Sequence, residues 1–93
     1  MRTIERTTRF KKDFKRELRG LHSATMEQDL RTVLAHLIND QPLPPKYRDH
    51  PLTGSWKDFR DCHVRPDLVL IYQKTEANTL RLVRLGSHSE LGL

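Results

Sequence analysis

The sequence predicts a small α+β domain in the order β-α-α-β-β-β, in which a helical hairpin packs on one face of a twisted, mainly antiparallel sheet. Two observations predict this fold. Apolar residues recur every three or four positions across residues 10–38, which is typical of amphipathic helices. After a Pro-rich segment at residues 39–55, three short runs have the composition of strands. Because the 93 residues contain no repeat and no linker, we expect residues 1–93 to form a single domain.

The amino-terminal half predicts one strand followed by two helices. Residues 2–7 alternate loosely and could form the first strand, with Ile4 facing the core. Thr7 or Thr8 can cap a helix that continues through residue 19, and Gly20 ends it. One face of this helix is apolar because its large residues are spaced by four: Phe10, Phe14 and Leu18.

A second helix is expected from about Thr25, since Thr25 and Gln28 have the spacing of a capping box. The four prolines and the glycine of residues 39–55 end this helix and predict a long irregular loop. The helix has a wide apolar stripe, which we expect to be buried: Met26, Leu30, Val33, Leu34, Leu37 and Ile38.

Three β-type runs follow the loop, and tight turns separate them. Residues 65–67 predict the first turn, because Pro66 fixes one backbone dihedral, and residues 76–78 predict the second. Gly86 closes the last strand, and we expect a short polar tail after it. The expected strands are Trp56 to Val64, Leu68 to Tyr72, and Leu80 to Leu85.

The net charge of +5 is concentrated at the amino-terminal end. Residues 2–19 contain eight Lys or Arg and three acidic residues, which account for the whole excess. Such a basic segment favours a polyanionic partner, either nucleic acid or an acidic protein. The alternative is a helix face that is merely solvated.

The composition excludes several classes of protein. No apolar run approaches the roughly 20 residues that a membrane-spanning helix needs, and the first residues do not resemble a secretory signal. Cys62 is the only cysteine, so it forms neither an internal disulfide nor a zinc site built on paired cysteines. We therefore expect a cytoplasmic protein with no membrane association.

Side chains able to transfer protons are concentrated in the carboxyl-terminal half. If the strands pair in order, His63 lies near the end of one strand, Asp67 lies across the next turn, and His88 follows the last strand. His50, on the Pro-rich loop, could border the same surface. The candidates for acid–base chemistry in this region are Asp49, His50, Asp61, His63, Asp67 and His88.

These residue types can cleave RNA without a metal ion. A base removes the proton of the 2′-hydroxyl, an acid protonates the leaving 5′-oxygen, and a cation stabilises the phosphorane. Histidine suits the first two steps because its pKa is about 6.5, and arginine suits the third. No cofactor is expected. A zinc site formed by His50, His63, His88 and Asp67 is the less favoured alternative, because no ligand spacing of the HxxxH kind occurs.

The same residues belong to a specific sequence pattern. The segment DHPLTGSWK at residues 49–57 is followed by RDCHV at 60–64, PD at 66–67, LIY at 70–72 and RLGSH at 84–88. This combination resembles the YafQ-type toxins of the RelE superfamily over almost the whole chain. The resemblance implies a RelE-like fold and a ribosome-dependent toxin that cleaves messenger RNA in the ribosomal A site. It also implies a cognate antitoxin, bound in a hetero-oligomeric complex.

The resemblance also indicates individual residues. It implies a catalytic set in which His88 is our first choice for the general acid, His50 and His63 supply the base and position the RNA, and Asp67 orients a histidine or acts as a base. Arg84 is expected to contact phosphate. The further cations expected at the RNA are Arg60, Lys57 and Arg48. Ribosome contacts are expected from the basic first helix, at Lys11, Lys12, Lys15 and Arg16.

Two positions depart from the family pattern, and one other function stays open. YafQ-type toxins can carry an aromatic residue directly after Asp67 and another near the carboxyl end, where this chain has Leu68 and Gly92. Base preference is therefore not predicted. The alternative function is a non-catalytic module that binds nucleic acid or protein through its basic helix. The histidine cluster favours the enzyme, because a module that only binds has no need of it.

Overall fold

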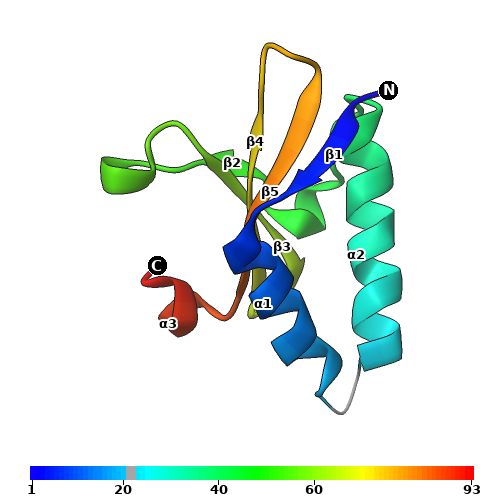
Figure 1. The fold of residues 1–93 in the computed structure, drawn as a ribbon, viewed down its shortest axis with the longest axis vertical. Helices are drawn as coiled ribbons and strands as arrows, with labels where there is room; N and C mark the ends of the chain where they lie inside the picture. Colours follow the sequence, from blue (N-terminus) through cyan, green and yellow to red (C-terminus); the bar gives the residue numbers. More distant parts are fainter. Residues whose placement is uncertain (21–22) are drawn as a thin grey trace.

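The structure, a computed structural model, describes residues 1–20 and 23–93. Its elements are shown in Figure 1. They are β1 (Thr3–Arg6), α1 (Thr8–Leu18), α2 (Ser23–Ile38), the 3-10 turn η1 (Pro45–Tyr47), β2 (His50–Pro51), the 3-10 turn η2 (Gly54–Trp56), β3 (Arg60–Arg65), β4 (Leu68–Lys74), β5 (Thr79–Gly86) and α3 (His88–Leu91).

The strands form one mixed sheet in the order β1-β5-β4-β3-β2. β1 is parallel to β5, and the other neighbouring strands are antiparallel. The α+β fold and the mainly antiparallel sheet are therefore confirmed. The short strand β2, at residues that we expected in a loop, adds a further edge to the sheet beside β3.

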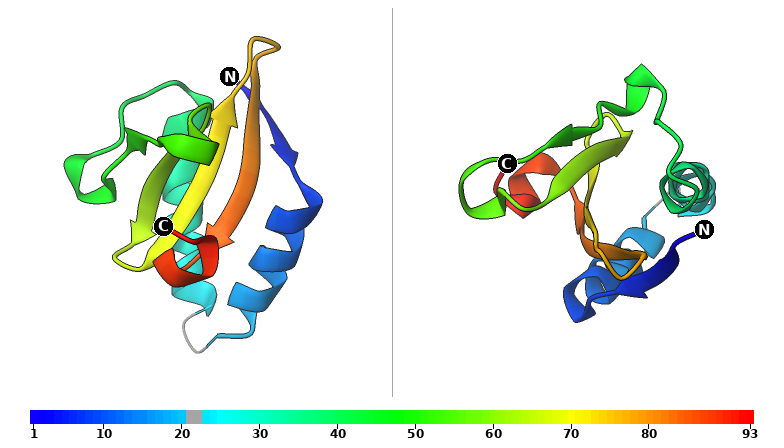
Figure 2. Two further views of the ribbon diagram at one scale, coloured as in Figure 1. Left: turned by 90° about the vertical axis from the view of Figure 1, so that its left-hand side faces the viewer. Right: turned by 90° about the horizontal axis from the view of Figure 1, so that it is seen from above.

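Helices α1 and α2 lie on the same side of the sheet, as the two apolar stripes predict (Figures 1 and 2). Thr7 caps α1, because its hydroxyl oxygen accepts a hydrogen bond from Phe10 N at 3.0 Å. The main core fills the space between the helices and the sheet, and its fully buried residues include Val33, Cys62, Leu70, Leu80 and Leu85. Within the described residues, none of the helices is long and apolar enough to span a membrane.

The short strand β1 pairs with only part of β5. Beyond it, side chains of α1 and of its cap Thr7 form hydrogen bonds with the backbone of β5. The Thr7 hydroxyl donates to Val83 O at 2.9 Å, and the Asp13 carboxylate accepts from Leu85 N at 3.0 Å. Arg16 donates to Leu85 O at 2.8 Å. The backbone groups at this edge are thus satisfied by a helix rather than by another strand.

The opposite face of the sheet carries a second, smaller apolar cluster. There Leu91 of α3 packs on Val69 and Ile71, and partly buried residues surround them: Leu52, Trp56, Phe59 and Val83. Figure 2 shows α3 and α2 on opposite sides of the sheet. The expectation of a polar tail after Gly86 is therefore wrong. Residues 88–91 form a helix, because the side chains of Ser87 and Glu90 form a capping box at its start.

Two of the expected boundaries are also wrong. The strand predicted from Trp56 to Val64 begins only at Arg60, because η2 occupies residues 54–56 and opens with Gly54 at φ 63°, a left-handed conformation that glycine adopts readily. The second helix begins at Ser23, so Thr25 lies inside its first turn rather than at its cap.

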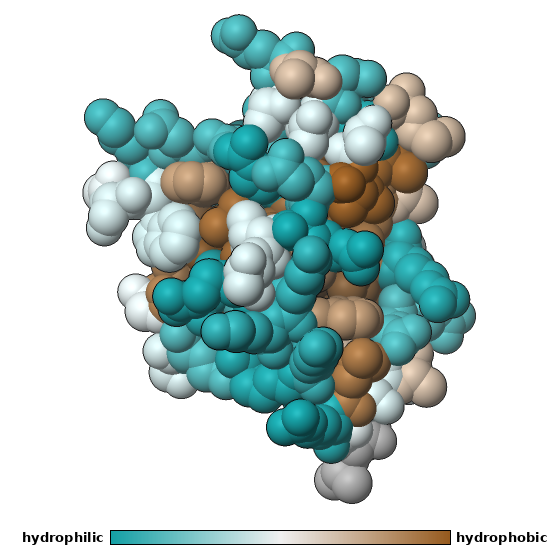
Figure 3. All heavy atoms as spheres, in the orientation of Figure 1, coloured by the Kyte–Doolittle hydropathy of each residue, from teal (hydrophilic) through white to brown (hydrophobic). Residues whose placement is uncertain are grey.

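Ile4 lies at the surface rather than in the core as expected. It is 41% exposed, because β1 is the outermost strand of the sheet. Together with α1 and α2 it borders a groove of about 450 Å³, where apolar side chains are visible at the surface in Figure 3. The apolar residues that line this groove are Ile4, Phe10, Phe14, Leu30, Leu34 and Leu82.

Candidate active site

The residues expected to be catalytic come together at one end of the sheet. His63 lies on β3, Asp67 lies in the β3–β4 turn, and His88 is the first residue of α3. His50 of β2 pairs across the sheet with Asp61 of β3. The ring centroids of His50 and His63 are 6.5 Å apart, and those of His63 and His88 are 4.9 Å apart. The rings are thus close enough to act on one phosphodiester group.

Asp67 fixes the orientation of His88. Its Oδ1 atom accepts a hydrogen bond from the backbone N–H of His88 at 3.0 Å and lies 2.6 Å from His88 Nδ1. Because an ionised carboxylate only accepts, Nδ1 carries a proton, and Nε2 is the nitrogen left to act on a substrate. The backbone and side-chain hydrogen bonds from His88 lower the pKa of Asp67, so this carboxylate stays ionised and accepts from His88.

His50 and Asp61 lie close together across the β2–β3 ladder. His50 Nδ1 lies 2.7 Å from the carbonyl oxygen of Arg48, which can only accept, so Nδ1 donates. His50 Nε2 lies 3.1 Å from Asp61 Oδ1, but this buried oxygen has no hydrogen-bond partner among the described residues. Burial raises the pKa of Asp61 despite the neighbouring histidines.

His63, between the two other rings, favours its neutral form. Burial lowers its pKa, and the charges of His88, Arg48 and His50 act in the same direction. The charge of Asp61 opposes them but does not outweigh them. His63 is therefore the ring best suited to accept a proton near neutral pH.

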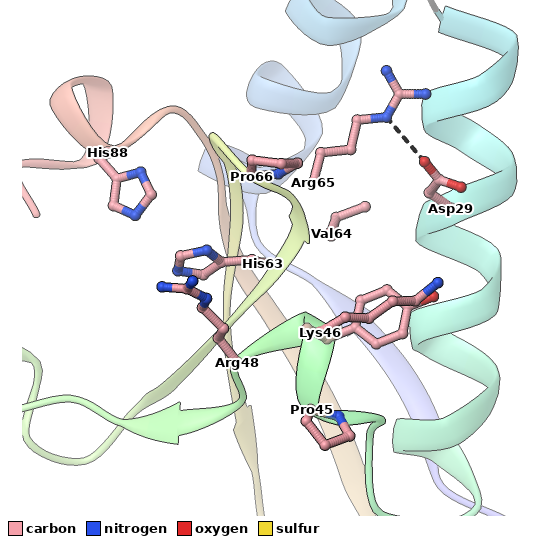
Figure 4. Close-up of a pocket in the computed structure, with 10 residues that line it drawn as sticks. Asp29, Pro45, Lys46, Arg48, His63, Val64, Arg65, Pro66 and His88 are labelled. Carbon is pink, nitrogen blue, oxygen red and sulfur yellow. Dashed lines mark hydrogen bonds and ion pairs between the residues drawn. The ribbon is translucent and has the colours of Figure 1, made fainter.

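A cleft of about 890 Å³ opens beside this cluster, between α2, η1 and the β3–β4 turn. Figure 4 shows His63 and His88 at one end of the cleft, with the Arg48 side chain directed toward His63. Lys46 and Arg65 line the cleft farther along. The cleft is thus a basic channel that leads to the histidines, which suits a polyanionic strand.

The other cations expected at phosphate lie elsewhere. Arg60 donates two hydrogen bonds of 3.3 Å to the carboxylate of Asp49, and Lys57 is exposed after η2. Arg84 donates to Asp13 at 2.7 Å. These three residues do not line the cleft, so the geometry brings only Arg48 of the expected phosphate contacts to His63 and His88.

The Arg84–Asp13 pair is largely buried and connects β5 to α1. The two side chains are 14% and 6% exposed. Burial alone would raise the pKa of Asp13, but the hydrogen bonds from Arg84 and Leu85 N and the charges of Arg84 and Arg16 lower it overall. Sequence reasoning missed Asp13 because Arg84 and Leu85, which donate to its carboxylate, are 71 and 72 residues away along the chain.

Asp61 was considered as a titratable group but was not assigned to the catalytic set. A signal for it was present, because alternate residues of a strand share a face and Asp61 lies two residues before His63. Cys62, between them, points to the opposite face and is fully buried, and burial raises the pKa of its thiol. The thiol therefore belongs to the core rather than to the site.

In residues 1–20 and 23–93, no three His, Cys, Asp or Glu side chains are arranged to hold a metal ion.

The family follows from the comparison with known proteins. A family model described as a bacterial toxin of type II toxin–antitoxin systems, YafQ, matches residues 2–92. The chain belongs to the YafQ family of toxins. The mRNA interferase toxin YafQ of Escherichia coli K12 is 42% identical to this YafQ-family chain over 90 residues, which cover 97% of this chain and 95% of that protein.

Solved structures of YafQ-family toxins have the same fold. A metal-bound toxin from Helicobacter pylori superposes with a TM-score of 0.87 at 51% identity, covering 98% of this chain and 99% of that chain. The DinJ–YafQ complex of E. coli matches with a TM-score of 0.79 at 40% identity, covering 98% of each chain. The RelE-like architecture expected from the sequence is thus confirmed.

Proposed function

We propose that this YafQ-family toxin is a ribosome-dependent endoribonuclease that cleaves messenger RNA in the ribosomal A site and so inhibits translation. The observation that carries the proposal is the histidine cluster, in which His50 and His88 are each paired with a carboxylate beside the neutral His63. The naming of the E. coli relative as an mRNA interferase supports it.

The geometry supports a division of roles between the histidines. His63 accepts the proton of the 2′-hydroxyl as the 2′-oxygen bonds to phosphorus. The bond from phosphorus to the 5′-oxygen then breaks, and His88 Nε2 gives its proton to that oxygen. The products are a 2′,3′-cyclic phosphate and a 5′-hydroxyl. Asp67 accepts from His88 Nδ1 and so fixes the orientation of the ring that donates through Nε2.

The extra charge of the phosphorane needs cations close by. We propose that Arg48 is such a cation, because it lines the cleft beside His63. Arg84 then acts on the fold through Asp13 rather than on the phosphate.

Two binding surfaces complete the proposal. Exposed lysines of α1 suit contacts with ribosomal RNA: Lys11, Lys12 and Lys15. The apolar groove between α1 and α2 suits an antitoxin segment with apolar and acidic side chains, because Arg6 and Arg31 lie at its rim and the surrounding amino-terminal segment holds the excess positive charge. A hetero-oligomeric complex with an antitoxin is expected, and the E. coli relative is known in complex with DinJ.

Cleavage on purified ribosomes tests the function directly. Ribosomes carrying a defined messenger RNA are mixed with the purified toxin, and new 5′ ends are mapped by primer extension. We expect cuts in the A-site codon, no cuts on the same RNA without ribosomes, and inhibition by the cognate antitoxin. Binding to ribosomes without any new 5′ ends would instead indicate the non-catalytic module.

Cleavage is expected to be independent of added metal, because protonated imidazoles fill the roles that a metal ion would take. The single-turnover rate on programmed ribosomes should be unchanged by EDTA at concentrations that leave the ribosome intact. The metal-bound Helicobacter pylori toxin makes this a necessary test. A loss of activity that zinc restores, together with stoichiometric zinc in the pure protein, would show that the proposal is wrong.

A further inference from the structure

Arg16 was expected to contact the ribosome, yet its guanidinium makes its contacts within the protein. It donates to Leu85 O at 2.8 Å and to Asp13 Oδ1 at 3.2 Å. Its Nε atom lies 3.1 Å from Glu17 Oε2 and 3.2 Å from Glu90 Oε2. Arg16 thus connects α1 and the end of β5 to α3.

The helix that carries His88, α3, is too short to be stable without contacts to the rest of the protein. α3 has four residues, far fewer than an isolated helix needs. It is held by the capping box of Ser87 and Glu90, by the burial of Leu91, and by the ion pair between Glu90 and Arg16. Glu90 uses Oε1 for the capping hydrogen bond to Ser87 N and Oε2 for Arg16.

Gly86 makes room for this contact. A Cβ atom at Gly86 would lie 2.9 Å from Arg16 Nη2 and 3.2 Å from Glu90 Oε1, which is too close for either group to stay in place. The arrangement therefore depends on a residue without a side chain between β5 and α3.

We propose that Arg16 is a positioning residue, which fixes His88 against Asp67 and His63 by holding Glu90. An exposed ion pair on its own would contribute little. This one is anchored at its other end by the buried carboxylate of Asp13, and a planar guanidinium loses little freedom when several acceptors share it. The predicted effect on rate rests on the proposed ribonuclease function, whereas the effect on the position of His88 does not.

The test compares Arg16→Met with Arg9→Met, which removes the same charge from an exposed position of the same helix. In single-turnover cleavage on ribosomes, Arg16→Met should lower the saturating rate about 10-fold, below the roughly 10²-fold that a 1 Å displacement of a catalytic group can cost. Its half-saturating ribosome concentration should stay within about twofold of the Arg9→Met value, because the same charge is lost in both variants.

A second readout needs no ribosome. NMR titration of the His88 ring, which faces Asp67 and His63, should show a changed pKa in Arg16→Met and none in Arg9→Met. Amide exchange at Glu90 and Leu91 should become faster. Glu90→Gln keeps the capping box but loses the charge, so it should give the same changes, and the double variant should be no worse than Arg16→Met.

Three outcomes would overturn the proposal. An unchanged His88 titration in both Arg16→Met and Glu90→Gln would show that Arg16 does not position His88. A raised half-saturating concentration with a parental saturating rate would make Arg16 a ribosome contact. If the effects of Arg16→Met and Glu90→Gln on the cleavage rate added up in the double variant, Arg16 would not act through Glu90. If no protein variant cleaves RNA, the proposed function fails, and the NMR readout still decides the role of Arg16.

Discussion

His88→Gln should fold like the parent and yet lose about 10²–10⁴-fold in the single-turnover rate of RNA cleavage on ribosomes. The side chain of His88 is 39% exposed, and its backbone N–H, which donates to Asp67, stays in the variant. The loss of stability should therefore stay within about 1 kcal/mol. Glutamine can donate a hydrogen bond to Asp67 but cannot transfer a proton.

The matched control is His36→Gln, because His36 lies on α2, away from the histidine cluster, and its ring Nδ1 bonds to Thr32 O of its own helix. It should cleave at the parental rate. If His88→Gln also cleaved at a near-parental rate, His88 would position the RNA, and the acid would have to be His50 or its partner Asp61. Unfolding of His88→Gln would instead show that its contact with Asp67 is structural.

Asp13→Ala should lower the free energy of unfolding by about 3 kcal/mol, the lower end of the cost of removing one partner from a buried ion pair. It leaves the guanidinium of Arg84 buried without its carboxylate and the N–H of Leu85 without its acceptor. Since about 1 kcal/mol shifts the Tm of a domain of this size by roughly 4–8 °C, the Tm should fall by about 12–24 °C. Thermal and urea unfolding measure the change.

Asp29→Ala is the matched control, because Asp29 makes a single ion pair with Arg65 at the surface and should cost less than about 1 kcal/mol. The pKa of Asp13 is lowered in the folded state, so its contribution is complete above the unfolded value of 3.8 and is lost as pH falls through the folded value. The difference in the free energy of unfolding between the parent protein and Asp13→Ala should therefore become smaller below about pH 4. If Asp13→Ala lowered the free energy of unfolding by no more than Asp29→Ala does, Asp13 would contribute no more than an ion pair at the surface.

The helices could be predicted well because their signals are local. In α1 and α2 the apolar residues repeat at helical spacing, and Thr7 caps the first helix as expected. The strand expected from Trp56 begins only at Arg60, because the turn η2 occupies residues 54–56. The helix α3 was missed, although the Ser87–Glu90 spacing of a capping box was visible, because four residues have no period to detect.

The sequence by itself determined which chemistry is available. It provides His50, His63, His88 and Asp67 around tight turns and strand ends, and an amino-terminal segment with all the excess positive charge. Short-range pairing along β3 and β4 is enough to bring these side chains to one end of the sheet, because each strand pairs with its neighbour in the chain. The family pattern carries the same information.

Only the tertiary structure showed which charged groups line the cleft and which are paired with other groups of the protein. Arg84 and Arg16 look like free cations in the sequence, but both meet Asp13, and Arg16 also meets Glu90. These contacts depend on α1 lying along β5, which follows from the parallel pairing of β1 with a strand more than 70 residues later. No local pattern encodes such a pairing, because its free energy comes from burying groups that are distant in the chain.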